Sequence, residues 1–190
     1  IINYDGGLKK SSKYSFSKIQ NFENLEPELI FHKKGLIFFN SKGTILNFAK
    51  NSKLIWKKNI YTKKEKKLNP ILFFASNEKT LIVTDSIGKY YALNIENGEL
   101  LWKNNHSSPF NSQIKIYEDR FFTVDYESRL NCFSIKNGNK IWEVSTEESF
   151  IKSVKKIFLI IKNNLVIFNN SIGDISAVNI NSGKFVCKMA

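Results

Sequence analysis

The sequence has few of the residues that carry catalytic, metal or disulfide chemistry. It contains two cysteines and two histidines in 190 residues. Cys132 and Cys187 form no CxxC motif, so neither a zinc site nor a disulfide framework is indicated. His32 and His106 are isolated, and neither a Gly-x-Ser-x-Gly motif nor a phosphate-binding Gly-x-x-x-x-Gly-Lys-Ser/Thr loop occurs. The sequence therefore predicts no catalytic, cofactor-binding or metal-binding residue.

Long apolar runs are missing as well. The longest candidate, residues 154–168, is interrupted by three lysines, and no run approaches the roughly 18 residues that a transmembrane helix needs. The chain begins at Ile1 in an apparent strand, and we expect no signal sequence within this segment. The chain starts within an apparent repeat and stops within another at Ala190, which leads us to expect a fragment of a longer protein.

Arginine is scarce in a strongly basic chain. Only Arg120 and Arg129 are arginines among 29 basic residues, and the formal net charge is +12. Lysine, asparagine, isoleucine and phenylalanine are the residues that AT-rich codons favour, so we expect no nucleic-acid partner. The lysines are scattered except for one cluster, which we interpret first as a solvated loop and second as a contact patch for an acidic partner. Its members are Lys63, Lys64, Lys66 and Lys67.

An eleven-residue motif recurs along the chain. The copy Ala92–Trp102 has a small residue first, Asn third, Ile fourth, Gly98 seventh and Trp last. Three other copies are aligned with it without gaps, 40 to 46 residues apart. They are Leu46–Trp56 (Ser52 for Gly), Cys132–Trp142 (with Gly138) and Ala177–Cys187 (with Gly183, and Cys for Trp). A faint trace at residues 1–7 resembles the start of the motif.

Each copy follows two further β-like segments. The second of these ends in a polar turn, at Asn40, Asp85, Asp125 and Asn169, which we interpret as turn chemistry rather than as an acid and base pair. Four antiparallel strands in about 45 residues are typical of one propeller blade. We therefore predict an all-β chain of about four four-stranded blades, half of an eight-bladed ring. The expected blades are 28–61, 62–105, 106–148 and 149–190, with 1–27 a remnant of a preceding blade and its connection.

The recurring Gly and Trp have structural interpretations. Asn-Gly at Gly98 and Gly138 is a strong hairpin signal, because both residues tolerate positive φ. We expect Trp56, Trp102 and Trp142 to pack between neighbouring sheets and to donate their indole N–H groups to backbone carbonyls. The small residues Ala92 and Ala177 would leave room for the large side chain, and an aromatic ligand box is the less favoured alternative.

The Ala-x-Asx-x-x-x-Gly-x-x-x-Trp spacing resembles the repeat of quinoprotein-type (PQQ-like) β-propellers. Ala92, Gly98 and Trp102 carry the resemblance best, which covers roughly residues 28–190. Within that superfamily the plain blades and short connections are most similar to the group of the outer-membrane-protein assembly factor BamB. The chain has no Cys-Cys dipeptide and no recurrent carboxylate cluster, which quinoprotein enzymes of this superfamily share.

The resemblance implies a non-catalytic, cofactor-free scaffold, periplasmic or associated with the outer membrane. Its implied partners are the β-barrel assembly machinery and unfolded outer-membrane proteins, which exposed strand edges would receive by β-augmentation. The alternatives are a fragment of a PQQ-dependent dehydrogenase with its active site elsewhere, and a sensor propeller fused to a membrane protein. The long connections suggest candidate contact residues, because loops carry most binding sites: Lys63, Lys64, Lys66, Lys67, His106 and Phe110.

Overall fold

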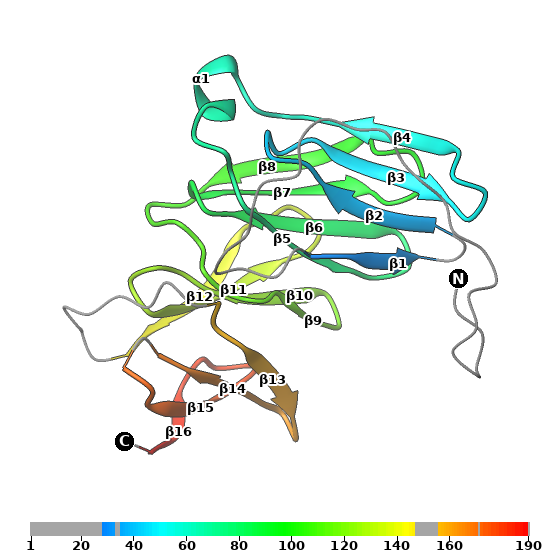
Figure 1. Ribbon diagram of the computed structural model, residues 1–190. Coiled ribbons are helices and arrows are strands. Elements are labelled where there is room, and N and C mark those ends of the chain that lie inside the picture. Colours follow the sequence, from blue (N-terminus) through cyan, green and yellow to red (C-terminus); the bar gives the residue numbers. More distant parts are fainter. Residues whose placement is uncertain (1–27, 33–34, 147–155, 171, 190) are drawn as a thin grey trace, which may run out of the picture.

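The computed structural model describes residues 28–32, 35–146, 156–170 and 172–189, and these form four separate four-stranded sheets. Each sheet is an antiparallel meander in chain order, and the sheets follow one another from β1–β4 to β13–β16 (Figure 1). The predicted all-β propeller blades are confirmed. The suggested blade remnant in residues 1–27 lies outside the described residues.

The strands of the four blades have these bounds. Blade one contains β1 (Ile30–His32), β2 (Gly35–Phe39), β3 (Ile45–Ala49) and β4 (Leu54–Lys58). Blade two contains β5 (Leu72–Ser76), β6 (Thr80–Asp85), β7 (Lys89–Asn94) and β8 (Leu100–Asn105). Blade three contains β9 (Lys115–Tyr117), β10 (Arg120–Val124), β11 (Arg129–Ser134) and β12 (Lys140–Ser145). Blade four contains β13 (Leu159–Lys162), β14 (Leu165–Asn169), β15 (Ile175–Asn179) and β16 (Phe185–Met189).

The middle strands of blades two and three are apolar on both faces because each of these two blades packs against a neighbouring blade on either side. In β6, Leu81 and Val83 pack with blade one, whereas Ile82 packs with blade three. Such strands appear in the sequence as continuous apolar runs. The outer strands β8 and β12 alternate between partly buried and exposed positions. The first strands of successive blades contact one another, which places them nearest the propeller axis.

One helical turn departs from the expected loops. α1 (Lys63–Lys66) lies between blades one and two. Thr62 caps it: the Thr62 hydroxyl accepts a hydrogen bond from the Glu65 amide, and the Glu65 carboxylate accepts one from the Thr62 amide. This reciprocal capping box satisfies two free amides at the helix start. The cluster predicted as a solvated loop thus forms one helical turn, and its lysines are exposed or partly exposed.

Glu28 connects three blades near the axis. Its carboxylate accepts a hydrogen bond from the Phe74 amide of β5 at 3.2 Å and pairs with the Lys156 ammonium just before β13. This charge pair, with both side chains largely buried, links the first blade to the segment that leads into the fourth. Within the described ranges, no helix has the length and apolar character needed to cross a bilayer.

Candidate functional site

Each tryptophan of the motif packs on the motif glycine of the next blade. A Cβ added to Gly98 would lie 2.7 Å from the Trp56 ring, and one added to Gly138 would lie 2.6 Å from the Trp102 ring. Gly183 faces Trp142 in the same way, at 2.9 Å. The three glycines have φ near +70°, so the turn and the neighbouring indole both require glycine. The sequence indicated only the turn requirement.

The indole nitrogens add a hydrogen bond to two of these contacts. Trp56 Nε1 donates to the Ile95 carbonyl at 3.0 Å, and Trp102 Nε1 donates to the Ile135 carbonyl at 2.8 Å. Both isoleucines are the fourth residue of the motif. Trp142 Nε1 is buried without a hydrogen-bond partner within the described part of the chain. The first two junctions between blades thus combine Trp–Gly packing with an indole hydrogen bond, whereas the third shows the packing without that hydrogen bond among the described residues.

The first copy of the motif is one residue shorter than the others. Trp56 pairs across the strands with Asn47, whereas Trp102 pairs with Ala92, Trp142 with Cys132 and Cys187 with Ala177. The gapless alignment that placed Leu46 first was therefore wrong by one position. Ser52, at φ 66°, closes the shorter turn by donating its amide to the Ala49 carbonyl.

A polar side chain organises the turn after the second strand of every blade. In each case its Oδ1 accepts hydrogen bonds from the amides two and four residues on, at 2.8–3.1 Å. The fourth member is Asn170, not the predicted Asn169, because β14 extends one residue further than the sequence alignment implied. The four are Asn40, Asp85, Asp125 and Asn170, and the turn chemistry assigned to this position is what the structure shows.

The two aspartates also bind a side chain from the preceding inter-blade connection. Tyr61 donates its hydroxyl to Asp85 Oδ2 at 2.5 Å, and both side chains lie in the interior between blades one and two. Burial raises the pKa of the Asp85 carboxyl and outweighs the hydrogen bonds from Tyr61 and the turn amides. Burial also raises the pKa of Tyr61, so the tyrosine remains a neutral donor.

Asp125 has a charged environment at the equivalent position. His106 Nε2 lies 2.8 Å from its Oδ2, and Arg129 Nε donates to the same oxygen at 2.9 Å. Burial favours the protonated acid, but the hydrogen bonds from His106 and Arg129 dominate together, so the pKa of Asp125 is below its usual range. The pairing of His106 could not be predicted from the sequence, because its partner Asp125 lies in the turn of the following blade.

Two of the candidate contact residues are internal. Phe110 is 1% exposed and packs against Tyr90, Phe133 and the His106 ring. The His106 side chain is only 7% exposed. Both residues serve the junction of blades two and three, so their prediction as partner contacts was wrong. Their neighbours Ser107 and Pro109 are exposed. Lys63, Lys64 and Lys67 are exposed on α1, and Lys66 is partly exposed.

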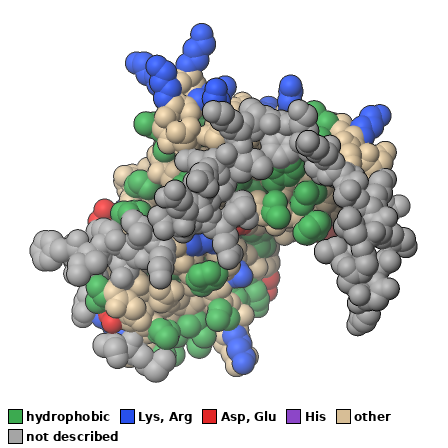
Figure 2. Space-filling view, viewed as in Figure 1, with side chains coloured by type: hydrophobic (Ala, Val, Ile, Leu, Met, Phe, Trp, Pro, Cys, Tyr) green, Lys and Arg blue, Asp and Glu red, His purple; other side chains and the backbone are tan. Residues whose placement is uncertain are grey.

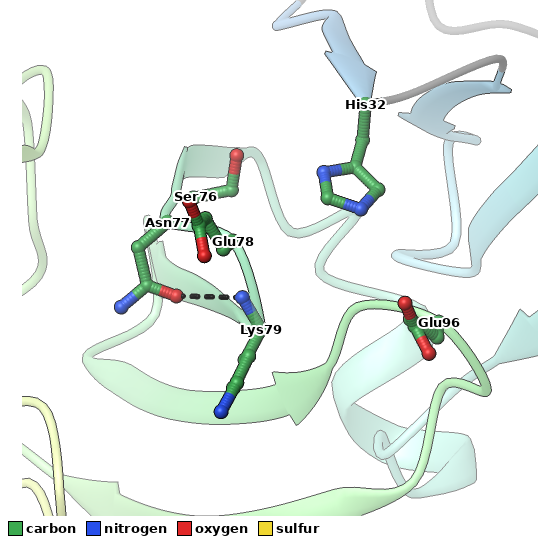
Figure 3. A pocket seen from close by; sticks show the side chains of 6 residues that line it. All are labelled: His32, Ser76, Asn77, Glu78, Lys79 and Glu96. Carbon is green, nitrogen blue, oxygen red and sulfur yellow. Dashed lines mark hydrogen bonds between the residues drawn. The ribbon is translucent and has the colours of Figure 1, made fainter.

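An open cavity of about 630 Å³ lies at the end of blades one and two that is opposite to α1 (Figure 3). His32 faces it from β1, and Glu78 and Lys79 border it from the turn between β5 and β6. His32 Nε2 is buried without a hydrogen-bond partner in the part of the chain that the structure describes. Among the same residues, no three His, Cys, Asp or Glu side chains converge as metal ligands do. The described residues that line the cavity are polar, and no hydrogen bond joins His32 Nε2 to a nucleophile among them.

The two cysteines are both free, and their surroundings differ. Cys132 is buried opposite Trp142, and burial raises the pKa of its thiol to about 12. Cys187 is exposed on β16. Cys132 therefore acts as a small apolar residue in the core of blades three and four.

The profile of the family described as outer membrane protein assembly factor BamB matches residues 41–188. The chain belongs to this family of PQQ-like propellers. BamB from Moraxella catarrhalis is similar in structure, with a TM-score of 0.64 and 16% identity over 85% of this chain and 50% of that chain. The chain thus spans about half the length of that BamB. No curated protein sequence matches significantly.

Other propellers share the fold at similar scores. Quinohemoprotein alcohol dehydrogenase from Comamonas testosteroni gives a TM-score of 0.66 and 10% identity, over 87% of this chain and 35% of that chain. The computationally designed Ika4 protein gives 0.63 and 12% identity, over 86% of this chain and 96% of that chain. At such identities the likenesses establish the blade architecture alone.

Proposed function

We propose that the chain is part of a non-catalytic propeller that binds proteins during outer-membrane β-barrel assembly, in the periplasm or at the outer membrane. The observation that carries the proposal is the match of the BamB family over residues 41–188. The buried carboxylates of the turns after the second strands support the non-catalytic part of the proposal. Asp85 and Asp125, the fully buried carboxylates there, are occupied by internal donors and hold the blades together.

The proposed contact face is the end of the blades that carries the inter-blade connections. Ser107 and Pro109 are exposed there, beside the anchored His106, and α1 presents its lysines on the same end. A rigid connection binds a partner without a large ordering cost. The outer strand of each blade is the last in its sheet, which leaves an edge to which an extended client could add by β-augmentation.

The test is copurification of the full-length protein with the β-barrel assembly machinery of the same organism. We expect the central β-barrel subunit of that machinery to copurify with the protein, and we expect Ser107→Lys to reduce the amount recovered. The matched control is Ser182→Lys, which makes the same change on an exposed turn at the opposite end of blade four. Unchanged recovery with Ser107→Lys would remove this face from the proposal, and absence of the barrel subunit would overturn the function.

The second candidate is a segment of a quinone-dependent dehydrogenase. It is kept as a candidate because quinohemoprotein alcohol dehydrogenases share the fold at TM-scores of 0.66 and 0.67. The two candidates differ in one measurement on the full-length protein. Incubation with pyrroloquinoline quinone and calcium, followed by alcohol and an electron-accepting dye, gives dye reduction only if the dehydrogenase assignment is right.

A further inference from the structure

The positive charge of the chain is concentrated in a short stretch. Residues 41–70 contain nine lysines and one acidic residue, Glu65, and so carry eight of the twelve net positive charges. The fold gathers seven of these lysines at one corner, formed by the turn after β2, the end of β4 and α1. We call this surface the basic corner: Lys42, Lys57, Lys58, Lys63, Lys64, Lys66 and Lys67. Lysine side chains project there from the upper edge of the molecule, over α1 (Figure 2).

The basic corner has no internal countercharge within the described residues. The one acid nearby, Glu65, caps α1 and forms a 2.7 Å ion pair with Lys89 of β7. None of the seven lysines has a carboxylate of the described residues within 4.0 Å, and five of them are exposed. Seven like charges held close together repel one another, which favours an external anionic partner.

Internal contacts fix the backbone that carries these lysines. Asn59 donates to the Lys42 carbonyl at 3.0 Å and to the Thr44 hydroxyl at 2.8 Å, which ties the end of β4 to the turn after β2. Tyr61 is anchored on Asp85, and Lys89 lies over the Tyr61 ring. The corner is therefore preformed, and a ligand pays little to order it.

Leu68 gives the corner an apolar tip. It directly follows Lys67, its side chain is 64% exposed, and its amide donates to the Glu65 carbonyl at the end of α1. A protruding leucine beside lysines that pair with no carboxylate of the described residues suits the boundary between headgroups and acyl chains, where peripheral membrane anchors combine basic and apolar side chains. The lysines of the corner also lack the forked geometry with which arginine recognises one particular carboxylate.

We propose that the basic corner binds an anionic lipid surface, with Lys63, Lys64 and Lys67 at the headgroups and Leu68 inserted between them. This interaction goes beyond the proposed protein scaffold and does not depend on it. Each lysine close to an anionic membrane strengthens binding about fivefold. Salt weakens the attraction, because the Debye length is only about 10 Å at 0.1 M.

Sedimentation of the protein with vesicles tests the proposal. We expect binding to phosphatidylcholine vesicles that contain phosphatidylglycerol and none to phosphatidylcholine alone. Lys63→Gln with Lys64→Gln should lower the partition coefficient roughly 30-fold. Leu68→Ser should lower it too and leave its salt dependence unchanged. The control pair, Lys79→Gln with Lys136→Gln, removes the same charge from exposed turns at the other end of the blades.

Three results would overturn the lipid proposal. The first is equal binding to both vesicle types, and the second is an equal loss with the control pair. The third is binding of polyglutamate without binding of vesicles, which would assign the corner to an acidic protein. Thermal melts of each variant check the fold, and unchanged melts are expected because the four lysines are exposed or protrude from turns.

Discussion

Asp85 and Asp125 occupy the same turn position but should respond differently to replacement by asparagine. Asn40 and Asn170 show that an amide Oδ1 serves the turn equally well. Asp85→Asn keeps that acceptor and removes a carboxylate whose pKa burial has raised. We expect it to change the free energy of unfolding by less than about 1 kcal/mol.

Asp125→Asn removes the acceptor of two charge-assisted hydrogen bonds and directs an amide N–H₂ towards His106 and Arg129. Such bonds contribute about 1.5–3 kcal/mol each. The Arg129 side chain is 24% exposed, so its share is partly screened. We expect a total loss of about 3 kcal/mol at neutral pH, which for a chain of this size lowers Tm by roughly 6–12 °C. Urea unfolding of both variants measures the difference.

The pH dependence gives an independent check with opposite signs. The pKa of Asp125 is lowered on folding, so its contribution is present above the unfolded pKa of about 3.9 and is lost as pH falls through the folded pKa. The pKa of Asp85 is raised, so protonation favours the folded state and its contribution declines as pH rises through the folded pKa. Equal destabilisation by the two variants, or parallel pH profiles, would refute this reasoning.

Four other predictions follow from the packing. Gly138→Ala should destabilise more than Gly173→Ala in urea unfolding, because both have positive φ but only the Gly138 Cβ would meet an indole, at 2.6 Å. Trp102→Ala should cost roughly 3–5 kcal/mol, and a thermal shift near zero would contradict its packing role. A thiol reagent at pH 8 should label Cys187 quickly and Cys132 only after unfolding, since the pKa of Cys132 is about 12. The chain should self-associate through the apolar residues Phe158 and Ile160, each 58% exposed on blade four, and Ile160→Lys should shift sedimentation towards monomer.

The sequence predicted the blades because their signals are local. Apolar runs, Asn-Gly turns and a Trp at fixed spacing each lie within one repeat, and the hydrogen-bond ladders of β5–β8 and β9–β12 follow that spacing. The one-residue contraction before Trp56 was missed because Ser52 occupies the place of a glycine at the same distance from Trp. Only the strand register, with Asn47 opposite Trp56, reveals it.

Contacts between blades could not be deduced in the same way. The spacing of Gly and Trp within a repeat does not say which glycine meets which indole, since Trp56 meets Gly98 from the next copy. His106 and Phe110 looked like loop residues because their partners, Asp125 and Tyr90, lie in other segments. α1 had a visible sign in the Thr62-x-x-Glu65 capping box, but one polar turn lacks the apolar periodicity that identifies longer helices.

The most direct test of the proposed function is a binding titration between the purified full-length protein and the purified central barrel subunit of the assembly machinery from the same organism. The account predicts saturable binding that Ser107→Lys weakens and Ser182→Lys leaves unchanged. Absence of binding at all concentrations, together with quinone-dependent dye reduction by the same protein sample, would contradict it.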